Sequence, residues 1–336
     1  MTPQTAPESR SLVAIVVTHN RLDKLQATLA RLLESAPEYL TAVVVMDNVS
    51  TDGTGDWLAG QRDPRLHVLT STTNTGGAGG FETGMKHAVA TLDPDWIVVM
   101  DDDARPCPDA LAAFHDCARP DDTAVAAAVF FPDGRICEMN RPSVNPFWNP
   151  GVFLRTLGRG RDGYHISYAA YEVREGSPID LASFVGLFLS RRMIREVGFP
   201  EGKLFLYGDD VIYTLRLRRR GLKMIFDPSV RFEHDCSTFQ DDQKREFRPL
   251  WKAYYSYRNG LIMYHQAAGL LFWPLLALLV PKWWLAGGRY GADRATYLRL
   301  LRCAVWDAVR NRVTRSHKEV LALSGSEYPG DSAPKG

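Results

Sequence analysis

Short apolar runs alternate with segments of helical periodicity over the first hundred residues, and this alternation constrains the fold more than any other feature. Residues 12–17, 42–46, 66–69 and 96–100 are apolar runs of strand length. Between the first two runs, leucines at helical spacing over residues 21–33 predict an amphipathic helix. Strands that alternate with helices indicate βαβ units. The sequence therefore predicts an α/β fold, Rossmann-like, with a mainly parallel sheet flanked by helices.

Each predicted strand is followed by a cluster of polar residues. In an open parallel sheet, ligands bind beyond the carboxyl ends of the strands. We therefore expect the four clusters to converge on one rim of the sheet and to form a single binding site. The clusters are Thr18, His19 and Asn20; Asp47 and Asn48; Asn74, Thr75, Gly76 and Gly77; and Asp101, Asp102 and Asp103.

The last cluster places three carboxylates directly after an apolar strand. Adjacent carboxylates repel one another and resist burial unless positive charge compensates them. A divalent cation satisfies this requirement, and ligands that are all oxygen suit Mg²⁺ or Mn²⁺, which usually also bind substrate phosphates. The alternative is a solvated acidic turn. The strand that precedes the cluster and the neighbouring motifs favour a metal site that uses Asp101 and Asp103.

A glycine-rich segment, residues 74–81, precedes a predicted helix over residues 81–90. Glycines such as Gly76, Gly77 and Gly79 let backbone N–H groups approach phosphate oxygens, and a helix N-terminus favours an anion. The segment matches neither a P-loop nor a dinucleotide fingerprint, and many such segments are merely turns. Beside a carboxylate metal site it predicts a nucleoside diphosphate donor.

A second acidic pair, Asp209 and Asp210, follows Gly208 and opens a helical pattern over residues 211–220. A positioned Asp can remove the proton of an attacking hydroxyl, so one of the pair is a candidate general base. The alternatives are a helix N-cap pair and the Gly-Asp-Asp of RNA polymerase palms, which lies between paired strands rather than before a helix. His234 follows a further predicted strand and is a candidate third metal ligand.

Composition narrows the class of partner and the compartment. The net charge of +1 over 336 residues gives no overall attraction to nucleic acid. Five cysteines without C-x-x-C spacing argue against a structural zinc site or a disulfide framework and predict a reducing, cytoplasmic compartment. The N-terminus lacks the apolar region of a secretory signal. We expect residues 1–10 and 324–336 to be disordered, residues 11–245 to form the catalytic domain, and residues 246–323 to form a helical region.

The helical C-terminal region predicts an association with a membrane surface. Residues 269–280 are strongly apolar but are shorter than a bilayer span, and Pro274 and Pro281 are expected to interrupt them. Residues 289–318 then carry eight Lys or Arg against two Asp. A hydrophobic wedge followed by a basic helix is typical of a monotopic membrane element. The alternative is a helical hairpin that packs on the catalytic domain or on another subunit of a homo-oligomer.

The ordered motifs resemble the family 2 inverting glycosyltransferases of the GT-A fold, and among them the bacterial galactofuranosyltransferases. Rhamnosyltransferases share much of the pattern. The resemblance covers residues 11–260. The segments that carry it are Val17 to Asn20, Asp47 to Gly53, Asn74 to Phe81, Trp96 to Asp103, Leu204 to Asp210, His234 and Tyr254 to Asn259.

The resemblance implies a role for each matching residue. Thr18, His19, Asn20 and Asp47 would hold the nucleoside of a nucleotide-sugar donor. Asp101 and Asp103 would handle the donor and a Mn²⁺ or Mg²⁺ ion, with His234 as a further ligand. Asn74, Gly76, Gly77, Gly79 and Asp102 complete the expected donor site. Asp210 would be the catalytic base, with Asp209 as the second candidate.

The predicted reaction is transfer of a sugar, best matched by galactofuranose from UDP-galactofuranose, onto a polyprenyl-linked glycan or polysaccharide acceptor with inversion of configuration. It would take place at the inner face of the cell membrane. A rhamnosyltransferase or another hexosyltransferase of the family remains an alternative. Two further alternatives are a non-catalytic sugar-nucleotide-binding subunit and a nucleotidyltransferase, which would release pyrophosphate.

Overall fold

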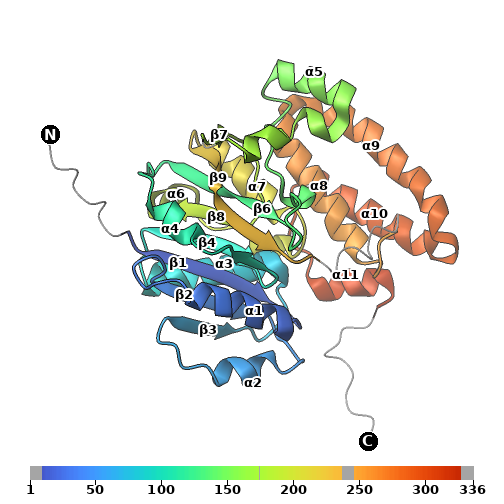
Figure 1. Ribbon diagram of the computed structural model, residues 1–336. Coiled ribbons are helices and arrows are strands. Elements are labelled where there is room, and N and C mark those ends of the chain that lie inside the picture. Colours follow the sequence, from blue (N-terminus) through green and yellow to red (C-terminus); the bar gives the residue numbers. More distant parts are fainter. Residues whose placement is uncertain (1–9, 174, 237–245, 327–336) are drawn as a thin grey trace, which may run out of the picture.

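The computed structural model describes residues 10–173, 175–236 and 246–326. Its central sheet has the strand order β3-β2-β1-β4-β8-β6-β9-β5, and β7 pairs with β9 (Figure 1). Residues 1–10 and 324–336 were predicted to be disordered, and all of them except residues 10 and 324–326 lie outside the described residues. The strands are β1 Leu12–Thr18, β2 Ala42–Asp47, β3 Leu66–Thr70, β4 Trp96–Asp101, β5 Ala104–Pro106, β6 Thr123–Phe130, β7 Ser177–Pro178, β8 Leu187–Ser190 and β9 Lys223–His234.

The sheet is mixed and mostly parallel, as the sequence predicted. β1 pairs in parallel with β2 and β4, and β2 pairs in parallel with β3. β6 is also parallel to β9, whereas β8 runs antiparallel to both β4 and β6. The alanine-rich strand β6 was not among the predicted strands. Its small side chains lack the β-branched pattern by which the other strands are recognised.

Helices cover both faces of the sheet. Because β1 is buried on both faces, its alternate residues enter two separate cores. Ile15 and Val17 pack in one core with Phe81 of helix α3 (Gly76–Thr91), and Val16 packs in the other with Leu25 of helix α1 (Leu22–Leu33). The helices of this part are α1 Leu22–Leu33, α2 Thr54–Ala59, α3 Gly76–Thr91, α4 Ala110–His115, α5 Pro150–Arg159, α6 Arg191–Val197 and α7 Asp209–Arg219.

The C-terminal helices form a layer against α7 (Figure 1). They are α8 Lys252–Ala268, α9 Phe272–Ala286, α10 Arg294–Val309 and α11 His317–Ser324. Tyr254 and Tyr257 of α8 pack with Tyr297 of α10, while Leu261 of α8 packs with Ile212 of α7. α8 is therefore shared between the α/β part and the C-terminal layer.

Two segments of glycine or proline are more helical than the sequence predicted. α3 begins at Gly76 rather than Phe81, so the glycine-rich segment forms the first turns of a helix. The expected interruption of the apolar C-terminal segment was also wrong, because α9 continues through Pro281. Pro274 lies in the first turn of α9, where a backbone N–H has no partner within the helix.

Candidate functional site

The carboxyl ends of β1, β2 and β4 bring the predicted polar clusters together at one rim. Thr18 Oγ1 donates to Asp102 Oδ2 at 2.8 Å. His19 Nδ1 donates to the backbone oxygen of Asn48 at 2.8 Å, and Asn48 Nδ2 donates to the backbone oxygen of Gly76 at 2.9 Å. Residues from four separate segments thus share one hydrogen-bonded edge, as the strand pattern predicted.

The outer part of this edge offers polar side chains to solvent. His19 and Asn20 are exposed, and Asn74 Nδ2 lies 3.3 Å from His19 Nε2. Because His19 Nδ1 donates to a carbonyl, Nε2 is the nitrogen that can accept a hydrogen bond. Asn20 adopts a left-handed backbone conformation, with φ of 55°, and its Oδ1 accepts from the Thr51 N–H at 2.6 Å. These side chains are held in place and accessible.

Asp47 lies deeper in the same edge. Its side chain is 1% exposed, and Oδ1 accepts from the backbone N–H of Ser50 at 3.0 Å. That bond closes the turn after β2. Asn48 Oδ1 also accepts from the Thr75 N–H at 2.9 Å, which joins this turn to the start of α3.

Two antiparallel strands bring His234 to the acidic cluster. β5 follows Asp103 directly and pairs with β9, so that Ala104 lies opposite His234. Ligand atoms of Asp101, Asp103 and His234 consequently lie within 4.8 Å of one another. Two carboxylates and an imidazole are a suitable donor set for Mn²⁺ and an acceptable one for Mg²⁺. These three predicted residues are therefore together in space.

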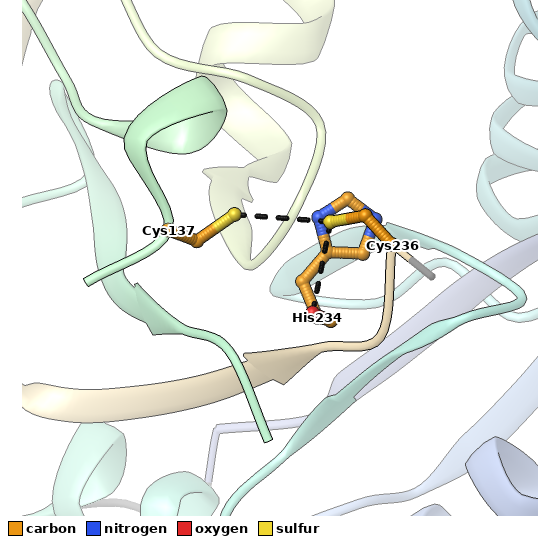
Figure 2. A group of neighbouring side chains, drawn as sticks. All are labelled: Cys137, His234 and Cys236. Carbon is orange, nitrogen blue, oxygen red and sulfur yellow. Dashed lines mark hydrogen bonds between the residues drawn. The ribbon is translucent and has the colours of Figure 1, made fainter. Parts of the chain in front are cut away.

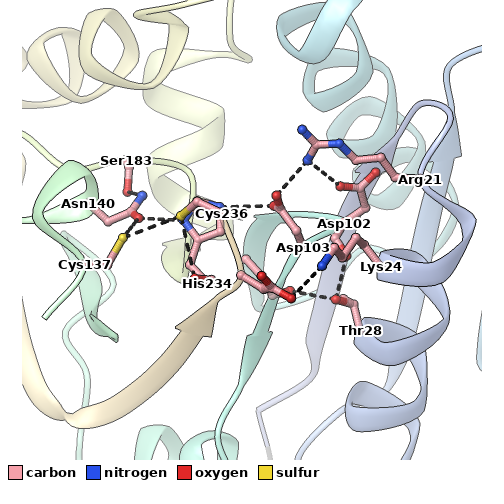
Figure 3. A network of polar contacts seen from close by, with 12 residues as sticks. Arg21, Lys24, Thr28, Asp102, Asp103, Cys137, Asn140, Ser183, His234 and Cys236 are labelled. Carbon is pink, nitrogen blue, oxygen red and sulfur yellow. Dashed lines mark hydrogen bonds and ion pairs between the residues drawn. The ribbon is translucent and has the colours of Figure 1, made fainter. Parts of the chain in front are cut away.

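Arg21 is a member of the site that the sequence analysis did not single out. Its Nη1 atom lies 2.7 Å from Asp103 Oδ2 and 3.3 Å from Asp102 Oδ1 (Figure 3). Asp102 is 3% exposed and also accepts from Thr18. Thr18 and Asp102 thus bond to each other, and their geometry favours support of the site over direct contact with a ligand. The position of Arg21 directly after the Thr18–Asn20 cluster was the signal available in the sequence.

The positive groups near the acidic cluster do not fully compensate the negative charge of its carboxylates. Burial, and then the charge of Asp103, raises the pKa of Asp101 to about 7. Burial raises the pKa of Asp102 to about 6 even though Arg21 opposes it. For Asp103, burial would raise the pKa, but the hydrogen bond with His234 helps to hold it below its usual value. A cation bound here would relieve this repulsion, which supports the fit of a divalent metal ion.

Asp209 and Asp210 form the first turn of α7. The helix is capped by Gly208, with φ of 74°, so the alternative of an aspartate N-cap was wrong. Asp210 lines a cavity of about 380 Å³, together with Asn140, Ser183, Tyr264 and others. Burial raises the pKa of Asp210 to about 6. Burial and the charge of Asp210, with a smaller contribution from Asp101, raise the pKa of Asp209. Asp210 thus lines the cavity, whereas Asp209 is repelled by the negative charge of Asp101 in the acidic cluster.

Two buried residues of α8 hold the segment that leads into this acidic pair. Phe205 and Tyr207 have φ values of 67° and 68°, which are strained for residues other than glycine. Asn259 Nδ2 donates to the backbone oxygens of both Leu206 and Tyr207 at 2.8 Å. Arg258 Nη2 donates to the backbone oxygen of Leu204 at 2.8 Å. The resemblance includes the segment Tyr254 to Asn259 but implies no role for it; in the structure, its Arg258 and Asn259 position the backbone of residues 204–207.

The glycines of residues 76–80 serve mainly in packing. A Cβ at Gly76 would collide with the backbone oxygen of Phe205, and one at Gly80 would lie 2.5 Å from Val17 Cγ1. A Cβ at Gly79 would lie 2.5 Å from Thr75 Cβ, whereas one at Gly77 would meet nothing within 4 Å. The sequence placed these glycines before the helix, whereas they lie in the first turns of α3. Donor contact by Gly76, Gly77 and Gly79 stays a prediction.

Comparisons with known proteins identify relatives of this chain. The model for glycosyl transferase family 2 matches residues 13–170. The galactofuranosyltransferase GlfT1 of Mycobacterium tuberculosis is 30% identical over 305 residues, covering 83% of this chain and 88% of that protein. An undecaprenyl-phosphate mannosyltransferase of Micrococcus luteus is 30% identical over 227 residues, covering 67% of this chain and 84% of that protein. An N-acetylglucosaminyl-diphospho-decaprenol L-rhamnosyltransferase of Mycobacterium tuberculosis is 27% identical over 248 residues, covering 66% and 75%.

The fold agrees with that of solved glycosyltransferases. The mannosyltransferase PcManGT of Pyrobaculum calidifontis, solved in complex with GDP-Man and Mn²⁺, matches with a TM-score of 0.52 and 18% identity. The match covers 90% of this chain and 88% of that protein. At this identity the similarity shows the GT-A-like fold.

Proposed function

The chain belongs to glycosyltransferase family 2, and from this premise we propose that it transfers galactofuranose from UDP-galactofuranose to a lipid-linked glycan acceptor with inversion of configuration. Its family membership makes it a hexosyltransferase. The ligand atoms of Asp101, Asp103 and His234 lie together, and Asn140, which contacts His234, lines the same cavity as Asp210. This arrangement is the observation that carries the mechanism. The extended similarity to galactofuranosyltransferases favours the sugar.

In the proposed mechanism, Asp210 takes the proton of the acceptor hydroxyl. Its carboxyl lines the cavity, so an acceptor placed there can present a hydroxyl to it. The activated oxygen attacks the anomeric carbon from the face opposite the diphosphate, and a single displacement inverts the configuration. His19, Asn20 and Asn74 hold the donor at the outer edge, and Asp47 supports them from deeper in the same edge. Arg21 holds Asp103, and Asn259 fixes the segment before Asp210.

The metal ligands in this proposal are Asp101, Asp103 and His234. A Mn²⁺ or Mg²⁺ ion bound by them would supply positive charge at the diphosphate leaving group. The raised pKa of Asp101, which results from burial and repulsion by Asp103, is consistent with a site that gains a cation when the donor binds.

We assign the acceptor to a membrane lipid because of the surface of the C-terminal helices. Leu270, Leu278 and Leu285 are 88%, 71% and 78% exposed, respectively. Within the described residues, the region Lys252–Val309 contains a stretch long and apolar enough to cross a membrane. However, α9 has 15 residues, and a helix of that length is about 22 Å long, short of the roughly 30 Å bilayer core. We therefore propose that α9 lies in the membrane surface.

A second helix extends this apolar surface. Leu154 and Leu157 of α5 are exposed. α5 lies near the end of α8, because Thr156 and Ala267 line the same cavity, and Figure 1 places α5 beside the start of α9. We propose that both helices face the inner leaflet of the cell membrane, with residues 11–245 as the catalytic part and 246–323 as the membrane-associating part. A homo-oligomer that covers α9 instead is the alternative.

A donor panel tests the proposed reaction. UDP-galactofuranose, UDP-galactopyranose and dTDP-rhamnose are each offered with Mn²⁺ or Mg²⁺ and a polyprenyl diphosphate-linked acceptor. Release of nucleoside diphosphate and a new glycosidic bond are expected with UDP-galactofuranose. Turnover with dTDP-rhamnose alone would support the rhamnosyltransferase alternative. Release of pyrophosphate would overturn glycosyl transfer.

A further inference from the structure

A second cluster of side chains that can bind a metal shares His234 with the acidic site. Cys137 precedes the short helix η1 Glu138–Asn140, His234 ends β9, and Cys236 follows it. One ligand atom from each lies within 4.8 Å of the others (Figure 2). Both cysteines are buried, at 0% and 3% exposed. The two thiols are 99 positions apart in the chain, so C-x-x-C spacing could not reveal them.

The distance between the two thiols suits a shared metal ion. Cys137 Sγ lies 3.8 Å from Cys236 Sγ. Two thiolates on a tetrahedral zinc ion, each at about 2.3 Å from the metal, are about 3.8 Å apart. A disulfide would instead require about 2.05 Å between the sulfurs. The pair is therefore already at the separation of two ligands of one ion.

The imidazole of His234 presents a different nitrogen to each side. Its Nδ1 atom lies 2.7 Å from Asn140 Oδ1, which also accepts from Cys137 Sγ at 3.0 Å. Its Nε2 atom lies 3.1 Å from Asp103 Oδ1 on the opposite side (Figure 3). A histidine that binds a metal commonly donates its other N–H to a carboxylate, which fixes the tautomer and orients the ring. Asp103 occupies that position.

We propose that Cys137, Cys236 and His234 Nδ1 form a binding site for Zn²⁺ or another thiophilic divalent ion. Three protein ligands leave a fourth position for Asn140 Oδ1 or a water molecule. Asn140 and Ser183 also line the cavity beside Asp210, so the proposed site borders that cavity. Two thiolate ligands select zinc over Mg²⁺ and Mn²⁺, which prefer oxygen.

The site has a consequence that rests on the proposed function. When His234 binds Zn²⁺ through Nδ1, its Nε2–H donates to Asp103. The same Nε2 atom then cannot bind Mn²⁺. The two metal sites therefore compete for one imidazole. Loading the thiol site is expected to lower Mn²⁺-dependent transfer at least tenfold.

Cobalt binding tests the site without any reference to transfer. The full chain, reduced with a phosphine and freed of metal, is titrated with Co²⁺. A thiolate-to-cobalt charge-transfer band that saturates at one equivalent is expected, and Cys137→Ser and Cys236→Ser should each lose most of it. Cys303→Ser is the matched control, because Cys303 lies outside the cluster, and it should keep the band. Absence of the band in the wild type, or its persistence in the Cys137→Ser/Cys236→Ser double variant, would overturn the proposal.

A second measurement on the wild type guards against misfolded variants. X-ray absorption of the zinc-loaded protein should show two sulfur neighbours at about 2.3 Å, whereas oxygen and nitrogen neighbours alone would refute the site. Asp101→Asn separates the two proposals, because it removes a ligand of the Mn²⁺ site and leaves the thiols intact. The cobalt band should survive in Asp101→Asn. If the cobalt band survives in Asp101→Asn but zinc does not inhibit transfer by the wild type, the thiol site is supported and the proposed competition for His234 is wrong.

Discussion

Asp210 is the residue on which the proposed chemistry depends most. Asp210→Asn keeps the size of the side chain but removes the base, and we expect kcat to fall by about 10²–10⁴-fold, the usual contribution of a general base. Single-turnover transfer with saturating donor and metal would measure it. Asp209→Asn is the matched control variant, because Asp209 is adjacent in sequence but is not among the residues that line the cavity. Full transfer by Asp210→Asn, with loss in Asp209→Asn, would reassign the base to Asp209.

The pH dependence of transfer follows from the same carboxyl. Burial raises the pKa of Asp210 to about 6. The ionised form, which acts as the base, is therefore present above that pH and is lost as the pH falls through it. Below about pH 6, kcat at saturating Mn²⁺ and donor should decline by about tenfold per pH unit. A profile that stays flat down to pH 4.5 would contradict this role of Asp210.

The acidic cluster predicts stabilisation by metal. A cation that binds Asp101 and Asp103 only in the folded state adds RT ln(1 + [L]/Kd) to the free energy of unfolding, about 2.7 kcal/mol at a hundredfold excess over Kd. Thermal unfolding in Mn²⁺ should therefore shift upward in the wild type and shift little in Asp101→Asn. An equal shift in both proteins would place the ion elsewhere.

At the scale of elements, the glycines of α3 differ in how closely they pack against the rest of the molecule. Gly80 lies against Val17 of β1, and an added Cβ would come within 2.5 Å of it, whereas Gly77 faces open space. Gly80→Ala should lower the free energy of unfolding by about 1–3 kcal/mol through overpacking. Gly77→Ala should be neutral or raise it by about 0.5–1 kcal/mol, because alanine favours the helix.

Urea unfolding of the two variants compares them directly. Equal destabilisation by both substitutions would contradict the packing role of the glycines. It would favour a requirement for flexible backbone along the whole segment.

The α8 helix links two elements that the sequence analysis assigned to separate regions. Its Asn259 side chain donates to the backbone of Leu206 and Tyr207, which precede Gly208 and the acidic pair Asp209–Asp210. A boundary at residue 246 divides the chain into a part with an α/β pattern and a part with a helical pattern. The acidic pair nevertheless depends on hydrogen bonds that cross this boundary. Secondary structure could be predicted from periodicity, whereas this dependence arises only from packing.

At the scale of the whole molecule, the apolar face of α9 predicts how the protein meets its acceptor. Leu278→Glu/Leu285→Glu places two charges on exposed positions of α9 and should reduce co-sedimentation with anionic vesicles about tenfold or more, because charged side chains resist burial in the bilayer interface. Val68→Glu is the control, since Val68 is an exposed apolar residue of β3. It should leave vesicle binding unchanged.

Transfer to a soluble acceptor analogue should survive in the double variant, because the substitutions lie outside the catalytic residues. Unchanged vesicle binding together with a change from oligomer to monomer would show that a second copy covers α9.

The sequence by itself determined the α/β class, the strands β1 to β4 and the grouping of Thr18, Asp47 and Asp101 at one rim. These features depend on local hydrophobic periodicity and on the rule that parallel strands end at one edge. Tertiary structure alone decided which residues surround that rim. Arg21 meets Asp103, and Cys137 meets Cys236, through contacts between residues far apart in the chain. No local pattern encodes such contacts, because they arise only when β5 pairs with β9 and the packed helices fix the side chains.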